Sequence, residues 1–189
     1  MRSTVIYCLV ILVLSIQLLG CAHTTKYSRA LSKSTQKGQL YNLLTWNADV
    51  IWHATFFSDS FRREYAKEFA QLNHMGPVES ARWMAKQGEL QDKYWEFYLT
   101  IYTKKDFKEF SMNPESFWKI DLTTRGGATV EPTSIEQVPY RAADQIMFSH
   151  LNRWSKSYRV CFPKIALGDE VELNLKSMVG KSTLSWKVK

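Results

Sequence analysis

Residues 95–102, WEFYLTIY, alternate apolar and more polar side chains, and this period of two predicts a β-strand. Trp95, Phe97, Leu99 and Ile101 would face a core, whereas Tyr98 and Tyr102 would leave an aromatic outer face. The segment is therefore expected to be a half-buried strand, and the rest of the fold can be built outward from it.

The same alternation returns downstream at residues 118–122, 158–162, 171–175 and 184–188. Turn residues separate these segments, with RGG at 125–127 and GD at 168–169. Residues 128–138 return from the first turn, and Pro132 should hold that segment at a sheet edge or a bulge. Together they predict about six strands, paired antiparallel because hairpins connect them.

Upstream of residue 95 the apolar spacing is helical instead. From Leu40 to Leu72 apolar residues follow steps of three and four, with a kink or restart expected at residues 58–60. Gly76 suits a helix C-terminal cap and Pro77 opens a second helix over residues 78–90. Residues 139–155 read as a longer connection that is helical around 146–148.

The predicted fold class is α+β, with an N-terminal helical pair packed on a small antiparallel β-sandwich, loosely immunoglobulin-like, of about six strands. A small barrel with a helical cover is the alternative. We expect three parts: residues 1–20, residues 21–39, and a single domain over 40–189 with helices over about 40–91 and strands over about 93–189.

Composition favours a folded chain with anionic neighbours. The 189 residues are 45% hydrophobic and 14% aromatic, which is enough to build a core, and the formal net charge is +7. Nucleic acid and an anionic membrane surface are both candidates for the neighbour. A solvated basic surface without a charged partner is the plainer alternative.

The N-terminal segment ends on a specific pattern. Residues 5–14, VIYCLVILVL, begin an apolar run of about 15 residues, shorter than the about 20 needed to span a bilayer. Leu18-Leu19-Gly20-Cys21 follows, and it resembles the lipobox of bacterial lipoproteins. The departure is Leu19, where Ala or Ser is more usual.

This resemblance implies a processing route. Leu18, Leu19 and Gly20 would be recognised by the signal peptidase, and Cys21 would become the first residue, carrying a diacylglycerol on its thiol and an N-acyl chain such as palmitate. Two or more chains anchor a protein stably. In such lipoproteins an Asp directly after the cysteine favours retention in the inner membrane. Ala22 occupies that position here, so the resemblance implies the periplasmic face of the cell outer membrane. No other cofactor is expected.

Residues 21–39 would form an acylated N-terminus and a flexible basic tether, because residues 22–39 are rich in Ser, Thr and Lys and lack periodicity. Their cations are Lys26, Arg29, Lys33 and Lys37, and no acid accompanies them. These side chains could contact anionic headgroups or lipid phosphates. A merely solvated spacer is the alternative.

Catalytic signatures are missing. The sequence VGKST at 179–183 lacks the Gly that a phosphate-binding loop needs at position 175. Cys161 and His150 could pair as nucleophile and base, but Cys161 sits within an expected strand and reads as a free thiol. His53 and His74 are isolated rather than at ligand spacing. We therefore expect no catalytic residue, no metal and no nucleic-acid partner.

These observations favour a lipid-anchored cell-envelope protein that acts as a non-enzymatic binding or assembly module. Its partners would be the membrane, through the lipid anchor, and an envelope protein, for which Arg153, Trp154 and Arg159 are the candidate surface. A periplasmic carrier of a lipid or other apolar ligand is the alternative, and an envelope hydrolase is a further one.

Overall fold

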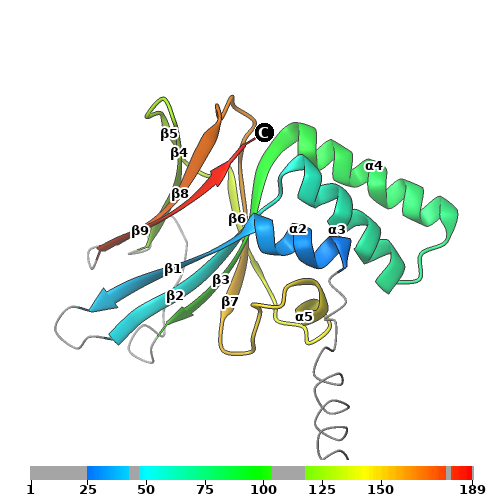
Figure 1. Ribbon diagram of the computed structural model, residues 1–189, viewed down its shortest axis with the longest axis horizontal. Coiled ribbons are helices and arrows are strands. Elements are labelled where there is room, and N and C mark those ends of the chain that lie inside the picture. Colours follow the sequence, from blue (N-terminus) through cyan, green and yellow to red (C-terminus); the bar gives the residue numbers. More distant parts are fainter. Residues whose placement is uncertain (1–24, 43–46, 104–117, 178–179, 189) are drawn as a thin grey trace, which may run out of the picture.

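The computed structural model describes residues 25–42, 47–103, 118–177 and 180–188. These residues form an α+β fold, as expected, with four helices and nine strands (Figure 1). The helices are α2 (Lys26–Ser34), α3 (Asp59–Leu72), α4 (Pro77–Lys93) and α5 (Asp144–Met147). The strands are β1 (Thr35–Asn42), β2 (Asn47–Phe56), β3 (Tyr94–Thr103), β4 (Lys119–Thr124), β5 (Thr129–Val130), β6 (Ser134–Val138), β7 (Lys156–Pro163), β8 (Glu170–Ser177) and β9 (Gly180–Lys187).

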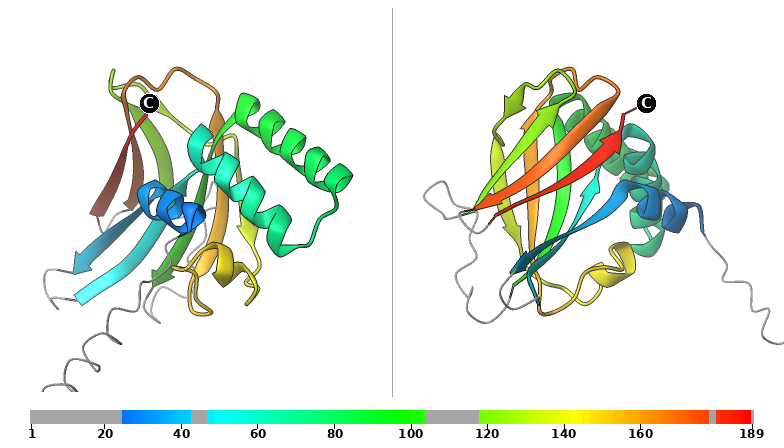
Figure 2. Two further views of the ribbon diagram at one scale, coloured as in Figure 1. Left: turned by 45° about the vertical axis from the view of Figure 1, so that its right-hand side comes forward. Right: turned by 60° about the vertical axis from the view of Figure 1, so that its left-hand side comes forward.

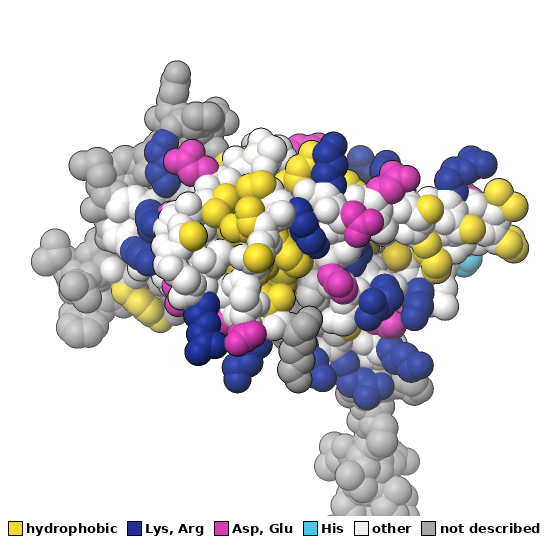
Figure 3. Space-filling view, turned by 90° about the horizontal axis from the view of Figure 1, so that it is seen from above, with side chains coloured by type: hydrophobic (Ala, Val, Ile, Leu, Met, Phe, Trp, Pro, Cys, Tyr) yellow, Lys and Arg dark blue, Asp and Glu magenta, His cyan; other side chains and the backbone are white. Residues whose placement is uncertain are grey.

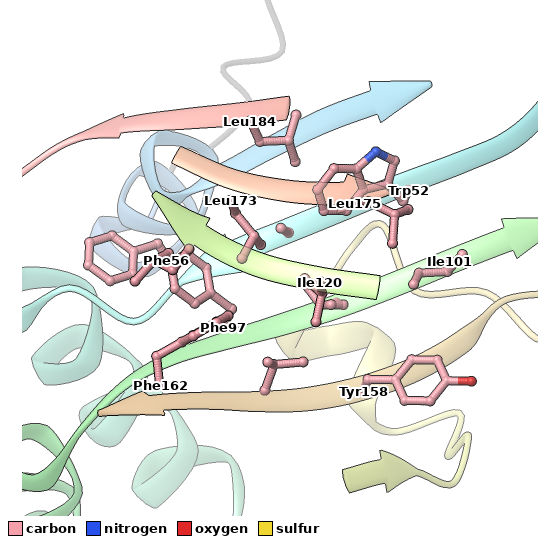
Figure 4. Close-up of a cluster of buried hydrophobic side chains, with 14 of the residues drawn as sticks. Trp52, Phe56, Phe97, Ile101, Ile120, Tyr158, Phe162, Leu173, Leu175 and Leu184 are labelled. Atoms are coloured by element: carbon pink, nitrogen blue, oxygen red, sulfur yellow. The ribbon is translucent and has the colours of Figure 1, made fainter. Parts of the chain in front are cut away.

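The strands make two antiparallel sheets that face each other. One has the order β1-β2-β3-β7-β6 and the other the order β5-β4-β8-β9. Apolar side chains of both sheets meet between them, among them Trp52, Phe97 and Leu173 (Figure 4). Burial of this apolar surface is the main favourable term that holds the sheets together.

The helices cover the outer face of the five-stranded sheet, so the molecule has three layers (Figure 2). A second apolar cluster fills the space between this sheet and α2, α3 and α5. It consists largely of aromatic rings, including Phe57, Phe61, Tyr65, Tyr98 and Phe148. Within the described residues no helix is long and apolar enough to cross a membrane.

The strand predicted at residues 95–102 is confirmed as β3, but its outer face is only partly open: Tyr102 is exposed and Tyr98 is not. Phe97, Leu99 and Ile101 point into the core between the sheets. Tyr98, on the opposite face, is buried under the helices, where its ring stacks on Phe148 with centroids 4.0 Å apart. The aromatic residues of this strand therefore serve two cores rather than one.

The helix predicted from Leu40 is wrong over its first half. Residues 35–42 and 47–56 form β1 and β2, which pair with each other. Val50, Trp52, Ala54 and Phe56 are all buried in the core between the sheets, so the side-chain period that matters here is two. Because apolar residues are dense here, they fit both the helical spacing of three and four and the strand period of two. Pairing with β3 decides for the strand.

The restart expected at residues 58–60 is where α3 begins. Ser58 is its N-cap, and the side-chain oxygen accepts a hydrogen bond from the backbone N–H of Phe61. The expected opening of the next helix by Pro77 is confirmed, but Gly76 is the N-cap of α4 rather than the C-cap of α3. The helical pair is therefore α3 and α4, preceded by a helix and two strands.

The prediction of a flexible tether is wrong for residues 25–39. Thr25 caps α2 by accepting a hydrogen bond from the Ser28 backbone N–H, and Tyr27 and Leu31 are buried against the body. The chain then enters β1 directly at Thr35, whose hydroxyl lies 2.8 Å from that of Thr55. The sequence did not reveal α2 as an amphipathic helix, because Tyr27 and Leu31 are the only large residues on its apolar face and its other residues are mostly Ser, Lys and Arg.

Downstream, the predicted strands at 118–122, 158–162, 171–175 and 184–188 are confirmed as β4, β7, β8 and β9. The single return strand expected over 128–138 is instead two, because Pro132 lies between β5 and β6, which belong to different sheets. The helix expected around 146–148 is confirmed as α5. The described residues thus hold nine strands where about six were expected.

Candidate functional site

A cleft of about 330 Å³ opens between α3 and α4. α3 packs Phe61 and Tyr65 against the five-stranded sheet, whereas Gln87 is the buried residue of α4. Side chains of both charges are exposed on the face of the molecule seen in Figure 3. We call this the α3–α4 cleft. Its lining is Asp59, Arg62, Arg63, Ala66, Lys67, Met84, Gln87, Gly88 and Gln91.

Arg62 is the most buried charge of this cleft, with a side chain only 3% exposed. Its Nε donates to Gln91 Oε1 at 2.7 Å and its Nη1 to Gln87 Oε1 at 3.1 Å, so two glutamines one turn apart on α4 hold the guanidinium. Nη2 donates to Glu96 Oε2 at 2.8 Å. The Phe57 ring lies 4.9 Å from Cζ. Each nitrogen of the guanidinium thus has a hydrogen-bond partner, which holds the planar group in place.

Glu96 stands between two arginines. Its second oxygen, Oε1, lies 2.8 Å from Nε of Arg159, off the line of a hydrogen bond. The Arg159 side chain is 42% exposed, whereas the Glu96 side chain is 4% exposed. One buried carboxylate therefore links α3 to β3 and β7 underneath the cleft.

The mouth of the cleft is predominantly cationic. Arg63 and Lys67 are exposed, and the only acid among the lining residues is Asp59, which accepts a hydrogen bond from Gln91 Nε2. Lys67 also pairs with Glu64 at 3.0 Å. With Met84 and Ala66 as apolar wall, the cleft can hold a small polar or anionic group.

The predicted partner surface is divided by the structure. Arg153 and Trp154 lie together in the loop that follows α5, with the guanidinium 4.6 Å from the centre of the indole, and Trp154 is 70% exposed. Arg159 instead points toward Glu96 beneath the helices. Sequence reasoning also missed Arg62. The available signal was Glu96, a lone acid among aromatic residues of β3.

The predicted basic residues near the N-terminus are all exposed. Lys26, Arg29 and Lys33 lie on one side of α2, spaced by three and four, while Tyr27 and Leu31 face the body. Lys37 lies on β1, directly across from His53 of β2. The cations are thus carried by ordered elements rather than by a linker. Leu18, Leu19, Gly20 and Cys21 lie outside the described residues.

Two histidines stack on the helical side of the sheet. The rings of His53 and His150 have centroids 5.2 Å apart, and Nε2 of His150 is buried without a hydrogen-bond partner. Burial, and then the neighbouring His53, lower the pKa of His150 from 6.5 to about 4. Burial and the charge of Lys37 lower the pKa of His53 as well.

We expect this pair to make the protein less stable in mild acid. In the unfolded chain His150 is protonated below about pH 6.5, whereas in the folded chain it is protonated only below its lowered pKa of about 4. The free energy of unfolding should therefore fall by about 2 kcal/mol between pH 8 and pH 5. Urea unfolding at both pH values measures this. His150→Phe should remove most of the difference, and an unchanged difference in that variant would contradict the assignment.

Cys161 and His150, considered above as a nucleophile and base, have separate surroundings, and so does the buried acid Asp121. Cys161 is a buried free thiol on β7 beside Glu96, and burial raises its pKa. His150 stacks on His53 instead, so the two share no partner. Asp121 pairs with Lys176 at 2.6 Å on the other sheet. Across the described ranges, no three His, Cys, Asp or Glu side chains gather in a group able to hold a metal.

Two further cavities lie elsewhere. One of about 380 Å³ lies between α2 and α5, and its lining includes Ser28 of α2, Ile146 of α5 and the neighbouring Thr25 and His150. The other, of about 650 Å³, lies along β4, β5 and β6 at the edge of the sandwich. No family model, curated protein or solved structure matches the chain.

Proposed function

We propose that this protein is a lipid-anchored cell-envelope protein whose body acts as a non-enzymatic binding or assembly module. The observation that carries the proposal is the position of α2. This helix begins five residues after Cys21, docks onto the body through Tyr27 and Leu31, and turns Lys26, Arg29 and Lys33 outward. Cations so close to an acylated cysteine suit an anionic membrane surface.

The body has features that suit recognition of a partner. We also propose that the two packed sheets form a loosely immunoglobulin-like sandwich, since such sandwiches present loops and strand edges on a rigid frame. The rings that fill the space between helices and sheet support a binding module over a carrier of apolar ligands. Outer-membrane placement at the periplasmic face, from Ala22, is part of the same proposal.

The anchor is tested by labelling cells with an alkyne analogue of palmitate. We expect the wild type to be labelled and Cys21→Ala to be unlabelled, because the thiol forms the thioether. Cys161→Ala is the matched control and should label as well as the wild type, since that cysteine lies buried in β7. Equal labelling of Cys21→Ala would overturn the anchor.

We place the partner site of the module in the α3–α4 cleft. Gly88 lines this cleft, and a Cβ at that position would meet no atom within 4 Å, so a large side chain can enter the cleft without disturbing the helix. Gly88→Phe should therefore block the site, whereas Gly88→Ala should leave it open.

Crosslinking in cells with an amine-reactive reagent, followed by mass spectrometry, measures the effect. We expect partner crosslinks at Lys67, inside the cleft, in the wild type and in Gly88→Ala, with at least a tenfold loss in Gly88→Phe. Crosslinks at the exposed Lys181 of β9 serve as an internal reference. Partner crosslinks at Lys67 that survive Gly88→Phe would rule out the cleft.

A further inference from the structure

The stretch between the proposed lipid anchor and the body is short. Thr25 already caps α2, so only residues 22–24 separate Cys21 from the ordered body. A fully extended chain spans about 3.3–3.6 Å per residue, which limits the distance between the Cα atoms of Cys21 and Thr25 to about 14 Å. If Cys21 is acylated, the end of the body that contains Thr25 must therefore lie at the membrane.

The connection between β6 and β7 lies at this same end. Ile146 of α5 lines one cavity together with Thr25 and Ser28 of α2, and the Tyr27 hydroxyl donates to the backbone oxygen of Met147. Figure 1 places α5 and the turn into β7 at the end of the molecule below α2. The α2 helix and residues 139–155 therefore form one surface, which we call the basal face.

The basal face exposes large apolar side chains that the fold does not need. Trp154 is 70% exposed and Ile146 is 63% exposed, and Tyr140 is exposed nearby in the same connection. Trp and Tyr are the residues that favour the boundary between lipid headgroups and acyl chains. The remaining tryptophans among the described residues, at positions 52, 83, 95, 118 and 186, are buried or half-buried.

The charge of the basal face also suits a lipid surface. Its exposed cations are Lys26, Arg29, Lys33, Arg141 and Arg153. Two acids face them, Asp144 at the start of α5 and Glu68 of α3, both partly buried. Cations within about 8 Å of an anionic surface, the Debye length at physiological salt, are still attracted to it.

We propose that the basal face docks onto an anionic phospholipid bilayer, with Trp154 and Ile146 inserted at the level of the headgroups and the cations of α2 on the lipid phosphates. The body would then lie flat on the membrane instead of hanging from it. This inference rests on the proposed acylation of Cys21, and it leaves the α3–α4 cleft, on a different side of the helical layer, open to a partner.

The test uses the full chain as cells produce it, reconstituted in vesicles of phosphatidylglycerol and phosphatidylcholine with brominated acyl chains, which quench tryptophan on contact. We expect strong quenching of the wild type and loss of most of it in Trp154→Phe. Ile146→Asp should also reduce quenching severalfold, whereas Val78→Asp should not, because Val78 is equally exposed at the far end of the α3–α4 hairpin. Salt at 0.5 M and purely zwitterionic vesicles should both weaken quenching.

Equal quenching of the wild type and Trp154→Phe would overturn the basal face. If palmitate labelling of Cys21 succeeds while Trp154 escapes quenching, the anchor stands and the basal face meets a protein or solvent. If labelling fails while Trp154 is quenched, the face binds lipid and the proposed anchor falls. The two failures are therefore distinguishable.

Discussion

Glu96→Ala should lower the free energy of unfolding by about 3–5 kcal/mol, because it leaves a buried arginine without its counter-charge. Among the residues that the structure describes, Glu96 supplies the one carboxylate paired with Arg62, and both side chains are almost fully buried. Without it, the guanidinium keeps its hydrogen bonds to Gln87 and Gln91 but remains an uncompensated buried charge. Arg159, which is partly exposed, can turn to solvent.

Urea unfolding measures this loss, and two variants separate charge from packing. Asp169→Ala breaks the Arg125–Asp169 pair, which has a similar N–O distance of 3.0 Å but is exposed on both sides, so it should cost less than about 1 kcal/mol. The double variant Arg62→Met/Glu96→Met removes both buried charges and should be more stable than Glu96→Ala. Equal losses in Glu96→Ala and Asp169→Ala would contradict the buried-charge explanation.

Gly38→Ala should cost about 3 kcal/mol or more, because β1 passes too close to Trp52 for any side chain. A Cβ at residue 38 would overlap Nε1 of Trp52 and lie 2.8 Å from Oγ of Ser182. It would therefore break the hydrogen bond of 3.0 Å that Trp52 Nε1 donates to Ser182, where β1 lies beside β9. Overpacking and a lost buried hydrogen bond each cost about 1–3 kcal/mol.

The matched control for this substitution is Gly88→Ala. This glycine lies within α4 and has open space at the Cβ position, so alanine should raise the free energy of unfolding by about 0.5–1 kcal/mol. The same chemical change should thus give opposite signs at the two positions. If Gly38→Ala proves neutral in urea unfolding, the close approach of β1 to Trp52 is wrong.

Local pattern predicted the downstream half of the body well. The alternations from residue 94 onward, the turns at RGG and GD, and the short helix near residue 146 all occur as expected. These features depend on neighbours along the chain, because a turn residue and a period of two act over a few positions. The helical pair also follows this logic, since Ser58 and Pro77 mark where each helix begins.

Prediction failed where long-range contacts choose between local options. The apolar residues around Val50 and Trp52 fit a helix or a strand, and pairing of β2 with β3, which is some fifty residues downstream, decides for the strand. Arg62 follows Phe61 on a helix and looks solvent-facing, yet it is buried because Gln87 and Glu96 are brought to it by α4 and β3. No window of adjacent residues contains that information.

The sequence by itself determined the mixed α+β class, the alternating strands after residue 94 and the cationic character of residues 26–37. Only the tertiary structure decided that those cations stand on a docked helix, that Tyr98 on the outer face of β3 is covered, and that a buried arginine lines the α3–α4 cleft. The physical reason is that periodicity is a property of neighbouring residues, whereas burial, strand pairing and ion pairing join residues far apart in the chain.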